Sequence, residues 1–561
     1  MKFPPLLPIL TLLALLGPVV AGLWGTVLPA FGHLPAAGLH GPSLDPFRAV
    51  FDWAGIGPAI QLSVTTGLFA TLGSLIIVVL ITAGWSGTRA FRLLEKLLSP
   101  LLSVPHAAAA FGFAFLIAPS GWIARLVSPT LTGWDRPVDW LIVQDPLGLT
   151  MTAGLIAKEV PFLLLITLAA LSQVDATQRM RVAQSAGYQR ITAWLKTVFP
   201  AIYHQIRLPV YVVLAYSMSV VDVAVILGPN TPPPLSVQIV KWMADPDLAF
   251  RLQAAAASLI QLGLVVGALI LWRIGEILLG LAGRRWAYAG RRQMLDRPLR
   301  GIGFGLGAIS AIVVFAGLAG LVIWSFAGFW AFPDALPQQL TLRSWIRHGP
   351  ASLDTLATTA WIALVATGIG LALTLGCLQT EQRHNLTLTE RGMWLLYLPL
   401  LIPQTAFLPG LQTLLINLGA DMGIWPVIFT HLVFVLPYLR LSLQDPFKAW
   451  DNRNAIVAAA LGSSPRRIFW HIRLPMMLAP ILTAIAVGIA VSVGQYLATL
   501  LVGGGRVSTL TTEAVALASG GDRRAIGVYG LMQTAAALVP FALAIALPAI
   551  IYRNRKGLRN G

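Results

Sequence analysis

Charged side chains are scarce in this chain of 561 residues, where Asp, Glu, Lys and Arg make up 11% of the sequence. A typical soluble domain has about 25%. Hydrophobic residues account for 57%, and the mean hydropathy is +0.76. Apolar runs of about 20 residues recur throughout, and each is long enough to cross a bilayer as a helix. The composition therefore excludes an ordinary soluble domain and predicts an all-α integral membrane protein.

Cysteine and the common catalytic motifs are nearly absent as well. Cys377 is the single cysteine, so the chain has no intramolecular disulfide and no multi-cysteine metal site. No HExxH, CxxC or GxSxG motif occurs. None of the seven lysines follows a glycine, which excludes the phosphate-binding loop G-x-x-x-x-G-K-[ST]. We expect no enzyme activity, no metal site and no bound cofactor in this chain.

The apolar runs predict twelve membrane spans and their orientation. With a cytoplasmic N-terminus, most of the 39 Lys and Arg residues lie on the cytoplasmic side. This bias follows the positive-inside rule, so we expect both termini in the cytoplasm. It also explains the net charge of +17 without a nucleic-acid partner. The predicted spans lie near residues 5–24, 57–83, 101–119, 147–171, 207–228, 252–272, 301–325, 354–377, 393–417, 425–443, 476–502 and 525–552.

The spans divide into two units of six. The first unit covers residues 1–280, the arginine-rich segment 281–300 is a predicted cytoplasmic linker, and the second unit covers 301–561. The fourth span of each unit carries a proline followed by an aromatic residue, and "SVVD" in the first unit matches "SVGQ" in the second. A parallel repeat of this kind predicts a solute pathway between the two units.

One loop is repeated between the fourth and fifth spans of each unit. "AQSAGYQRITAWLKTVFP" begins at Ala183 and "AAALGSSPRRIFWHIRLP" begins at Ala458, and in each a glycine precedes a proline by thirteen residues. Small residues before the glycine predict a short helix with a glycine cap. The basic and aromatic residues after it predict an amphipathic helix. Such a pair could rest on lipid head groups, but two copies with equal spacing favour a docking element.

These loops resemble the EAA loops of ABC-importer permeases, whose pattern is E-A-A-x-x-x-G, nine residues, then I-x-L-P. The glutamate of the pattern falls on Arg181 and Ile456. The chain is most similar to fused, two-copy permeases such as those for thiamine and ferric iron. The matching residues are Ala183, Gly187 and Pro200 in the first loop (172–206), and Ala458, Gly462, Ile472, Leu474 and Pro475 in the second loop (445–475).

The resemblance implies a type I (MetI-like) permease fold in the bacterial inner membrane, with each loop coupled to an ATPase. It also implies two copies of a cytoplasmic ABC ATPase, which use ATP and magnesium, and a periplasmic solute-binding protein on the opposite face. The expected function is the import of a small solute delivered by that binding protein. The sequence does not identify the solute, because thiamine-like molecules, ferric iron, anions and polyamines all use related permeases.

Three ionisable residues fall inside predicted spans: Lys158 and Glu159 in the fourth, and Asp222 in the fifth. A charge at that depth costs about 2.5–3.5 kcal/mol on insertion scales, so each needs a polar or wet environment. Adjacent helical residues do not face each other, and Asp222 is a candidate partner for Lys158. These residues and Gln495, the counterpart of Asp222, either line the solute pathway or clamp helices together.

Two other classes of protein stay open at this point. A twelve-helix secondary transporter driven by an ion gradient would also explain the ionisable residues within the spans. However, the loop from Gly84 lacks the aspartate of the major-facilitator pattern G-x-x-x-D-R-x-G-R-R. A membrane enzyme acting on oligosaccharides or lipids would need a catalytic acid or a metal cluster at a membrane face, and the sequence shows neither.

Overall fold

The computed structural model describes residues 6–553, except residues 36, 37, 40, 294, 385, 387, 388 and 421. Residues 1–5 and 554–561 of the predicted units, and residue 294 of the predicted linker, lie outside the described residues. Within the described part, nine helices are long and apolar enough to cross a membrane, and three bent helix pairs raise this number to as many as twelve. The predicted all-α membrane fold is confirmed.

The first half of the chain contains six spans joined by short helices. The spans are α1 (Leu6–Ala30), α3 (Ile56–Trp85), α5 (His106–Ile117) with α6 (Trp122–Val127), α7 (Leu149–Ser172), α10 (Phe199–Ser219) and α13 (Leu248–Tyr288). The joining helices are α2 (Asp45–Asp52), α4 (Arg89–Leu98), η2 (Ser99–Ser103), α8 (Ala176–Ser185), α9 (Arg190–Thr197), α11 (Asp222–Leu227) and α12 (Leu235–Met243).

The second half repeats this order. Its spans are α14 (Asp296–Phe326), α15 (Arg343–Arg383), α16 (Glu390–Leu401) with α17 (Gln404–Asn417), α18 (Ile424–Ala449), α22 (Leu478–Val493) and α25 (Arg523–Ile551). The shorter helices are α19 (Arg453–Ala460), α20 (Pro465–Ile468), the π-helical turn η3 (Phe469–Arg473), α21 (Leu474–Met476), α23 (Leu497–Val502) and α24 (Leu510–Ala518).

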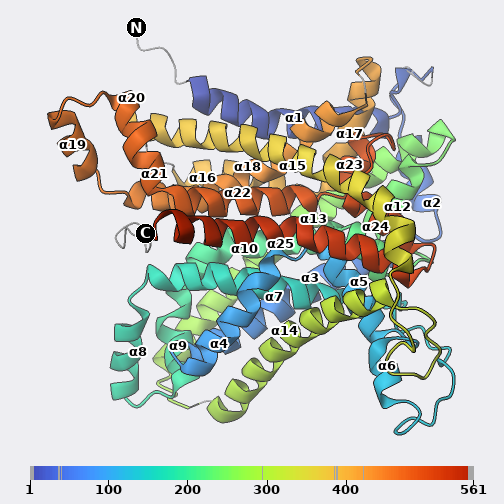
Figure 1. The fold of residues 1–561 in the computed structure, drawn as a ribbon, viewed down its shortest axis with the longest axis horizontal. Helices are drawn as coiled ribbons and strands as arrows, with labels where there is room; N and C mark the ends of the chain where they lie inside the picture. Colours follow the sequence, from blue (N-terminus) through green and yellow to red (C-terminus); the bar gives the residue numbers. More distant parts are fainter. Residues whose placement is uncertain are drawn as a thin grey trace.

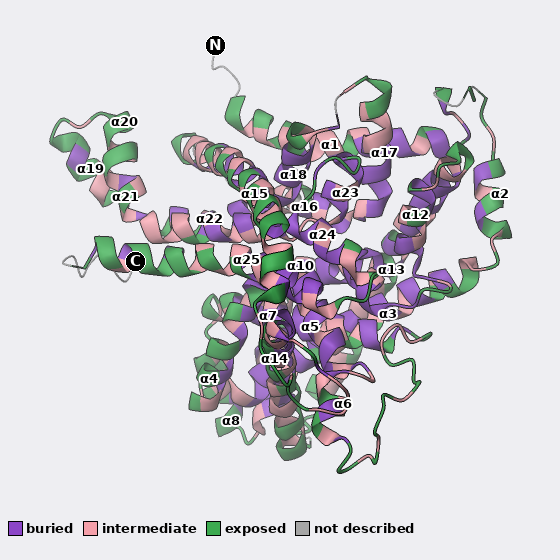
Figure 2. Cartoon of the chain, turned by 45° about the vertical axis from the view of Figure 1, so that its right-hand side comes forward, coloured by how far each residue is buried: buried purple, intermediate pink, exposed green. Residues whose placement is uncertain are grey.

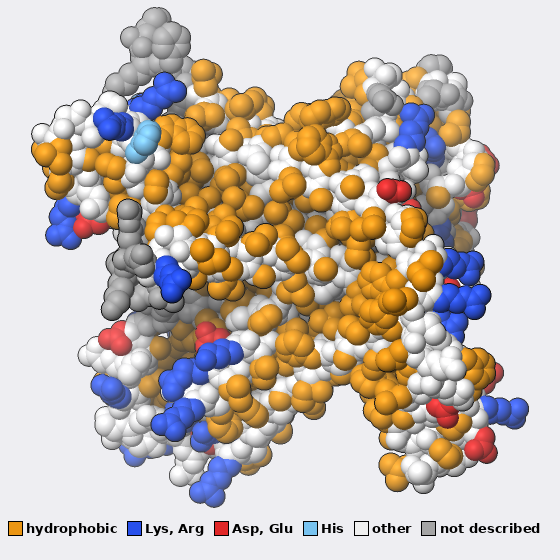
Figure 3. Space-filling view, in the orientation of Figure 1, with side chains coloured by type: hydrophobic (Ala, Val, Ile, Leu, Met, Phe, Trp, Pro, Cys, Tyr) orange, Lys and Arg blue, Asp and Glu red, His pale blue; other side chains and the backbone are white. Residues whose placement is uncertain are grey.

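The helices lie side by side, and the two repeated loops project from the same end of the bundle. Figure 1 shows α8, α9, α19 and α20 at the left, with α2, α6, α12 and α24 at the right. We call the left end the loop end. Buried residues gather in the middle of the bundle, whereas α8 and α20 are mostly exposed (Figure 2). Hydrophobic side chains cover the middle band of the surface, and Lys and Arg lie toward its two ends (Figure 3).

Each half sends its first helix across the other half. Helix α1 packs on α15, α17 and α18 of the second half, and α14 packs on α3, α5 and α7 of the first (Figure 1). Glycines make both crossings close: a Cβ on Gly410 would lie 2.0 Å from the carbonyl oxygen of Gly22, and one on Gly317 would lie 2.7 Å from the carbonyl carbon of Gly112. Small residues permit such backbone approach in membrane helices. The exchange joins the two halves into one bundle.

The structure adds detail to two predicted segments. The expected linker is mostly helical, because α13 continues to Tyr288 and α14 begins at Asp296; arginine is a good helix former and does not end these helices at the membrane boundary. The predicted ninth span is not continuous: α16 and α17 are bent by 81° at the break before Gln404. Pro403 lies in this break, where its ring disfavours helical geometry for the preceding residue.

Candidate functional site

A cavity of ≈ 420 Å³ lies between the two halves. The first half lines it with residues from η2, α5, α7 and α10, and the second half with residues from α16, α17, α18 and α22. Each half contributes two positions where a span is interrupted, at Pro105 and Val220 in one and at Ile402 and Gly494 in the other. The four residues predicted for the pathway, Lys158, Glu159, Asp222 and Gln495, all line this cavity.

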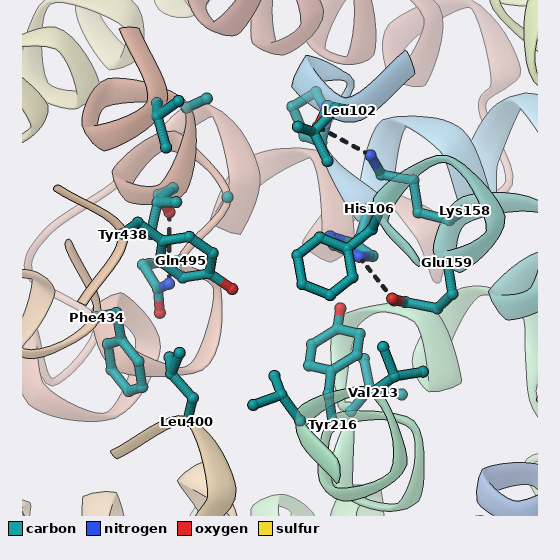
Figure 4. Close-up of a pocket in the computed structure, with 18 of the residues that line it drawn as sticks. Leu102, His106, Lys158, Glu159, Val213, Tyr216, Leu400, Phe434, Tyr438 and Gln495 are labelled. Atoms are coloured by element: carbon teal, nitrogen blue, oxygen red, sulfur yellow. Dashed lines mark hydrogen bonds and ion pairs between the residues drawn. The ribbon is translucent and has the colours of Figure 1, made fainter. Parts of the chain in front are cut away.

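Lys158 is bound to backbone carbonyl groups. Its side chain is 5% exposed, and Nζ donates to the carbonyl oxygens of Leu101 (2.8 Å) and Leu102 (3.1 Å) (Figure 4). These carbonyls lie near the end of η2, where helical partners run out and the partial charge is negative. The Lys158 ammonium therefore donates to these two carbonyls and not to Asp222, the candidate partner. Lys158 therefore clamps α7 to η2 while it lines the cavity.

Glu159 faces a histidine that sequence reasoning did not select. Its Oε1 lies 3.3 Å from Nε2 of His106, the first residue of α5, and the two face each other in Figure 4. The His106 ring also packs on Tyr216, with 4.9 Å between ring centroids. A signal for this site exists in the sequence, because Pro105-His106 in the third span is matched by Pro403-Gln404 in the ninth.

The second half presents a neutral wall to the same cavity. Gln404 Nε2 donates to Gln495 Oε1 at 3.3 Å, and Gln495 Nε2 donates to the carbonyl of Val491 at 3.4 Å. Phe434, at the position equivalent to Lys158, and Tyr438 lie on the same side of the cavity as Gln495 in Figure 4. The cavity is thus asymmetric, with ionisable groups on one side and amide and aromatic groups on the other.

Asp222 completes the ionisable wall. It opens α11 just after the break that ends α10, and it is 7% exposed. Among the described residues, no Lys, Arg or His nitrogen lies within 4.0 Å of the Asp222 carboxylate, which is the distance limit for an ion pair. A buried carboxylate without a counter-ion is costly, and within the described part of the chain only the backbone N–H groups at the start of α11 and the more distant His106 offset the charge of Asp222.

The two repeated loops have the same glycine-capped geometry. Gly187 and Gly462 adopt φ of +83° and +84°, in the left-handed region that glycine enters without strain. The residue after each glycine donates its backbone N–H to the carbonyl of Ala183 (3.2 Å) or Ala458 (3.0 Å), which is the Schellman pattern at a helix end. This geometry confirms the predicted helix–glycine–helix shape of both loops.

The proline ends of the loops also lie near the starts of spans. Pro200 is the second residue of α10, and Leu474 and Pro475 are the first two residues of α21, which precedes α22. At the start of the second loop, Arg453 donates to Asp451 through both its backbone and its guanidinium group. These hydrogen bonds hold the pKa of Asp451 below its ordinary value.

The first loop is held by the segment that joins the halves. The Asp296 carboxylate accepts the backbone N–H of Ile191 at 2.9 Å, which gives α9 a cap that its own Gln189 does not supply. Lys196 Nζ donates to the carbonyl of Arg291 at 2.9 Å and lies 4.5 Å from the ring centroid of Trp286. As a result, α9 is largely buried while α8 projects.

The second loop is held by its own half instead. The buried Arg473 donates to the carbonyl of Phe447 at 2.7 Å and also to Gln379 and Gln382 of α15. Its guanidinium lies 3.5 Å from the ring centroid of Phe447 and 4.8 Å from that of Trp450. Residues Pro465–Ile468 remain mostly exposed, so the second helix of this loop is more exposed than α9 of the first loop.

The chain joins two equivalent membrane units, with a cavity between them and matching loops at one end. This architecture is typical of the membrane subunits of transporters. The family described as the binding-protein-dependent transport system inner membrane component matches residues 368–556. This match includes the second loop and the second-half wall of the cavity.

Similar proteins extend the comparison to the whole chain. The inner membrane ABC transporter permease protein YnjC of Escherichia coli K12 is 32% identical over 551 residues, which cover 98% of each chain. The spermidine/putrescine permease PotC homolog of Mycoplasma pneumoniae is 32% identical over 145 residues, 26% of this chain and 50% of that relative. The molybdenum permease ModB of Mycobacterium bovis is 28% identical over 125 residues, 22% and 47% respectively. This chain belongs to the inner-membrane permeases of ABC transport systems.

Proposed function

We propose that the chain is the membrane subunit of an importer in which two copies of a cytoplasmic ATPase bind the first and second loops. A solute-binding protein would deliver a small solute at the end opposite the loops, and the cavity between the halves would receive it. ATP and magnesium would be used by the ATPase and not by this chain. The inner membrane would hold the chain with its loop end in the cytoplasm.

The observation that carries this proposal is the pair of equivalent exposed apolar residues at the loop end. Val182 of α8 and Val457 of α19 occupy matching positions before Ala183 and Ala458, and they are 64% and 60% exposed. Each lies on a helix that ends in the same left-handed glycine. Two exposed valines at matching positions, one on each half, suit two copies of one partner.

A pull-down with charge substitutions tests this assignment without straining the glycine caps. The chain would be purified in mild detergent from its native host, with and without Val182→Asp and Val457→Asp together. We expect a Walker-motif ATPase to copurify with the unsubstituted chain and to be lost from the double variant, because a buried unpaired carboxylate disfavours docking. The proposal fails if no ATPase copurifies under conditions that preserve importer complexes.

Leu131→Asp is the matched control for this experiment. Leu131 follows α6 at the opposite end of the bundle and is 81% exposed, so its substitution should leave the bound ATPase unchanged. Equal loss of ATPase from the control and from the double variant would assign the effect to general destabilisation. Proton-dependent uptake by the isolated chain, with no ATPase bound, would favour the gradient-driven transporter.

A further inference from the structure

Building on the proposed function, we infer that the cavity between the halves binds a small organic cation. Its positive group lies against Asp222 and Glu159, and its other end lies against the Gln404–Gln495 pair. The cavity volume of ≈ 420 Å³ falls within the range of about 300–1,000 Å³ for small-molecule sites. The inference concerns the solute and is independent of which ATPase binds the loops.

The charge balance of the lining favours a positive ligand. Two carboxylates, Asp222 and Glu159, line the cavity together with the ammonium of Lys158 and the imidazole of His106, and every one of them comes from the first half. The ammonium is turned toward the carbonyls of Leu101 and Leu102 (Figure 4). Its charge is therefore partly offset by the negative end of η2. Glu159 lies beside His106, and among the described residues Asp222 is the carboxylate of this wall without an ion-pair partner.

The two carboxylates line the cavity and can contact a bound ligand. Asp222 is more than nine-tenths buried and lines the cavity with no cationic partner within 4.0 Å among the described residues. Nε2 of His106 lies 3.3 Å from Oε1 of Glu159, so a ligand would share Glu159 with this imidazole and would meet Asp222 directly. A cationic ligand would provide the missing counter-charge in an environment that screens charge weakly. An anion placed there would be repelled by both carboxylates.

The rest of the lining favours an organic ligand over a bare metal ion. Among the described residues, no group of three or more His, Cys, Asp and Glu side chains could hold a metal ion. The lining includes the aromatic rings of Tyr216, Phe434 and Tyr438. Aromatic faces attract organic ammonium groups, and this attraction strengthens where water is excluded. The facing amides of Gln404 and Gln495 can both donate and accept hydrogen bonds to a neutral end of the ligand.

Binding of radiolabelled probes to the chain with its copurified ATPase in nanodiscs of neutral lipid tests the inference. The probes are thiamine, an aromatic cation, spermidine, a flexible polycation, and molybdate, an anion. We expect saturable binding of at least one cation and none of molybdate. Asp222→Asn should weaken cation binding by about tenfold or more, because it removes a buried charge partner, and Glu159→Gln should weaken it in the same direction.

Two further variants keep the test decisive. Asp354→Asn makes the same chemical change at an exposed position of α15 and should leave cation binding unaltered. Gln495→Glu adds a carboxylate to the neutral wall, so it should strengthen cation binding even if Asp222→Asn does not fold. Binding of molybdate alone would overturn the inference, as would cation binding that none of the cavity variants changes. If an ATPase copurifies but no cation binds, the inference fails and the proposed function stands.

Discussion

Two glycines three residues apart on α14 should respond in opposite directions to the same substitution. A Cβ on Gly317 would lie 2.7 Å from the carbonyl carbon and 3.0 Å from the Cα of Gly112 on α5, whereas a Cβ on Gly320 meets no atom within 4 Å. Gly→Ala in a helix interior gains about 0.5–1 kcal/mol from conformational entropy. Overpacking costs about 1–3 kcal/mol.

Because the entropy gain is common to both variants, their difference isolates the overpacking. We expect Gly317→Ala to be less stable than Gly320→Ala by about 1–3 kcal/mol, with Gly320→Ala at or above the stability of the unsubstituted chain. The unfolding temperature in detergent, followed by tryptophan fluorescence, measures this difference. Gly112→Ala added to Gly317→Ala should cost less than the sum of the single changes, because both act on one contact. Equal unfolding temperatures for the two single variants would refute the close crossing of α5 and α14.

Other contacts at the loop end, and the orientation of the chain, give three further predictions. Asp296→Ala removes the cap of α9 and costs ~1 kcal/mol, so the amides of α9 should exchange hydrogen about fivefold faster in mass spectrometry, and unchanged exchange would argue against the cap. Arg473→Met keeps side-chain length but removes the hydrogen bonds of the second loop, so proteolysis there should accelerate while cleavage of the first loop stays constant; equal acceleration in both loops would contradict separate anchoring. In a Cys377→Ala background, an impermeant maleimide should label Leu131→Cys in intact cells and Val182→Cys only after lysis, and the reverse pattern would invert the proposed orientation.

Sequence patterns were sufficient to predict the helical fold and the helix–glycine–helix shape of the two loops. Apolar length and the positive-inside bias depend on the bilayer as a solvent, and the structure confirms the all-α fold with nine to twelve candidate spans. The glycine caps of both loops were predictable because small residues followed by glycine define a local helix end, and Gly187 and Gly462 adopt that conformation. These features depend on neighbouring residues in the chain.

Features that depend on distant contacts could not be predicted in the same way. The role of Asp296 as a cap for α9 joins residues more than a hundred positions apart. The attachment of Lys158 to the carbonyls of η2 depends on where that helix ends, which span length alone does not determine. The packing of α1 on the second half depends on the close approach of Gly22 to Gly410. The sequence repeat does not indicate that these two glycines meet.

Native mass spectrometry of the detergent-solubilised complex tests the central claim most directly, because it counts the ATPase subunits bound to one chain. The proposed pair of docking loops predicts one chain with two ATPase copies. It also predicts that either Val182→Asp or Val457→Asp alone reduces the dominant complex to one copy or fewer. A chain that carries no ATPase, or that keeps two copies after both substitutions, would contradict the assignment of the two loops as docking sites.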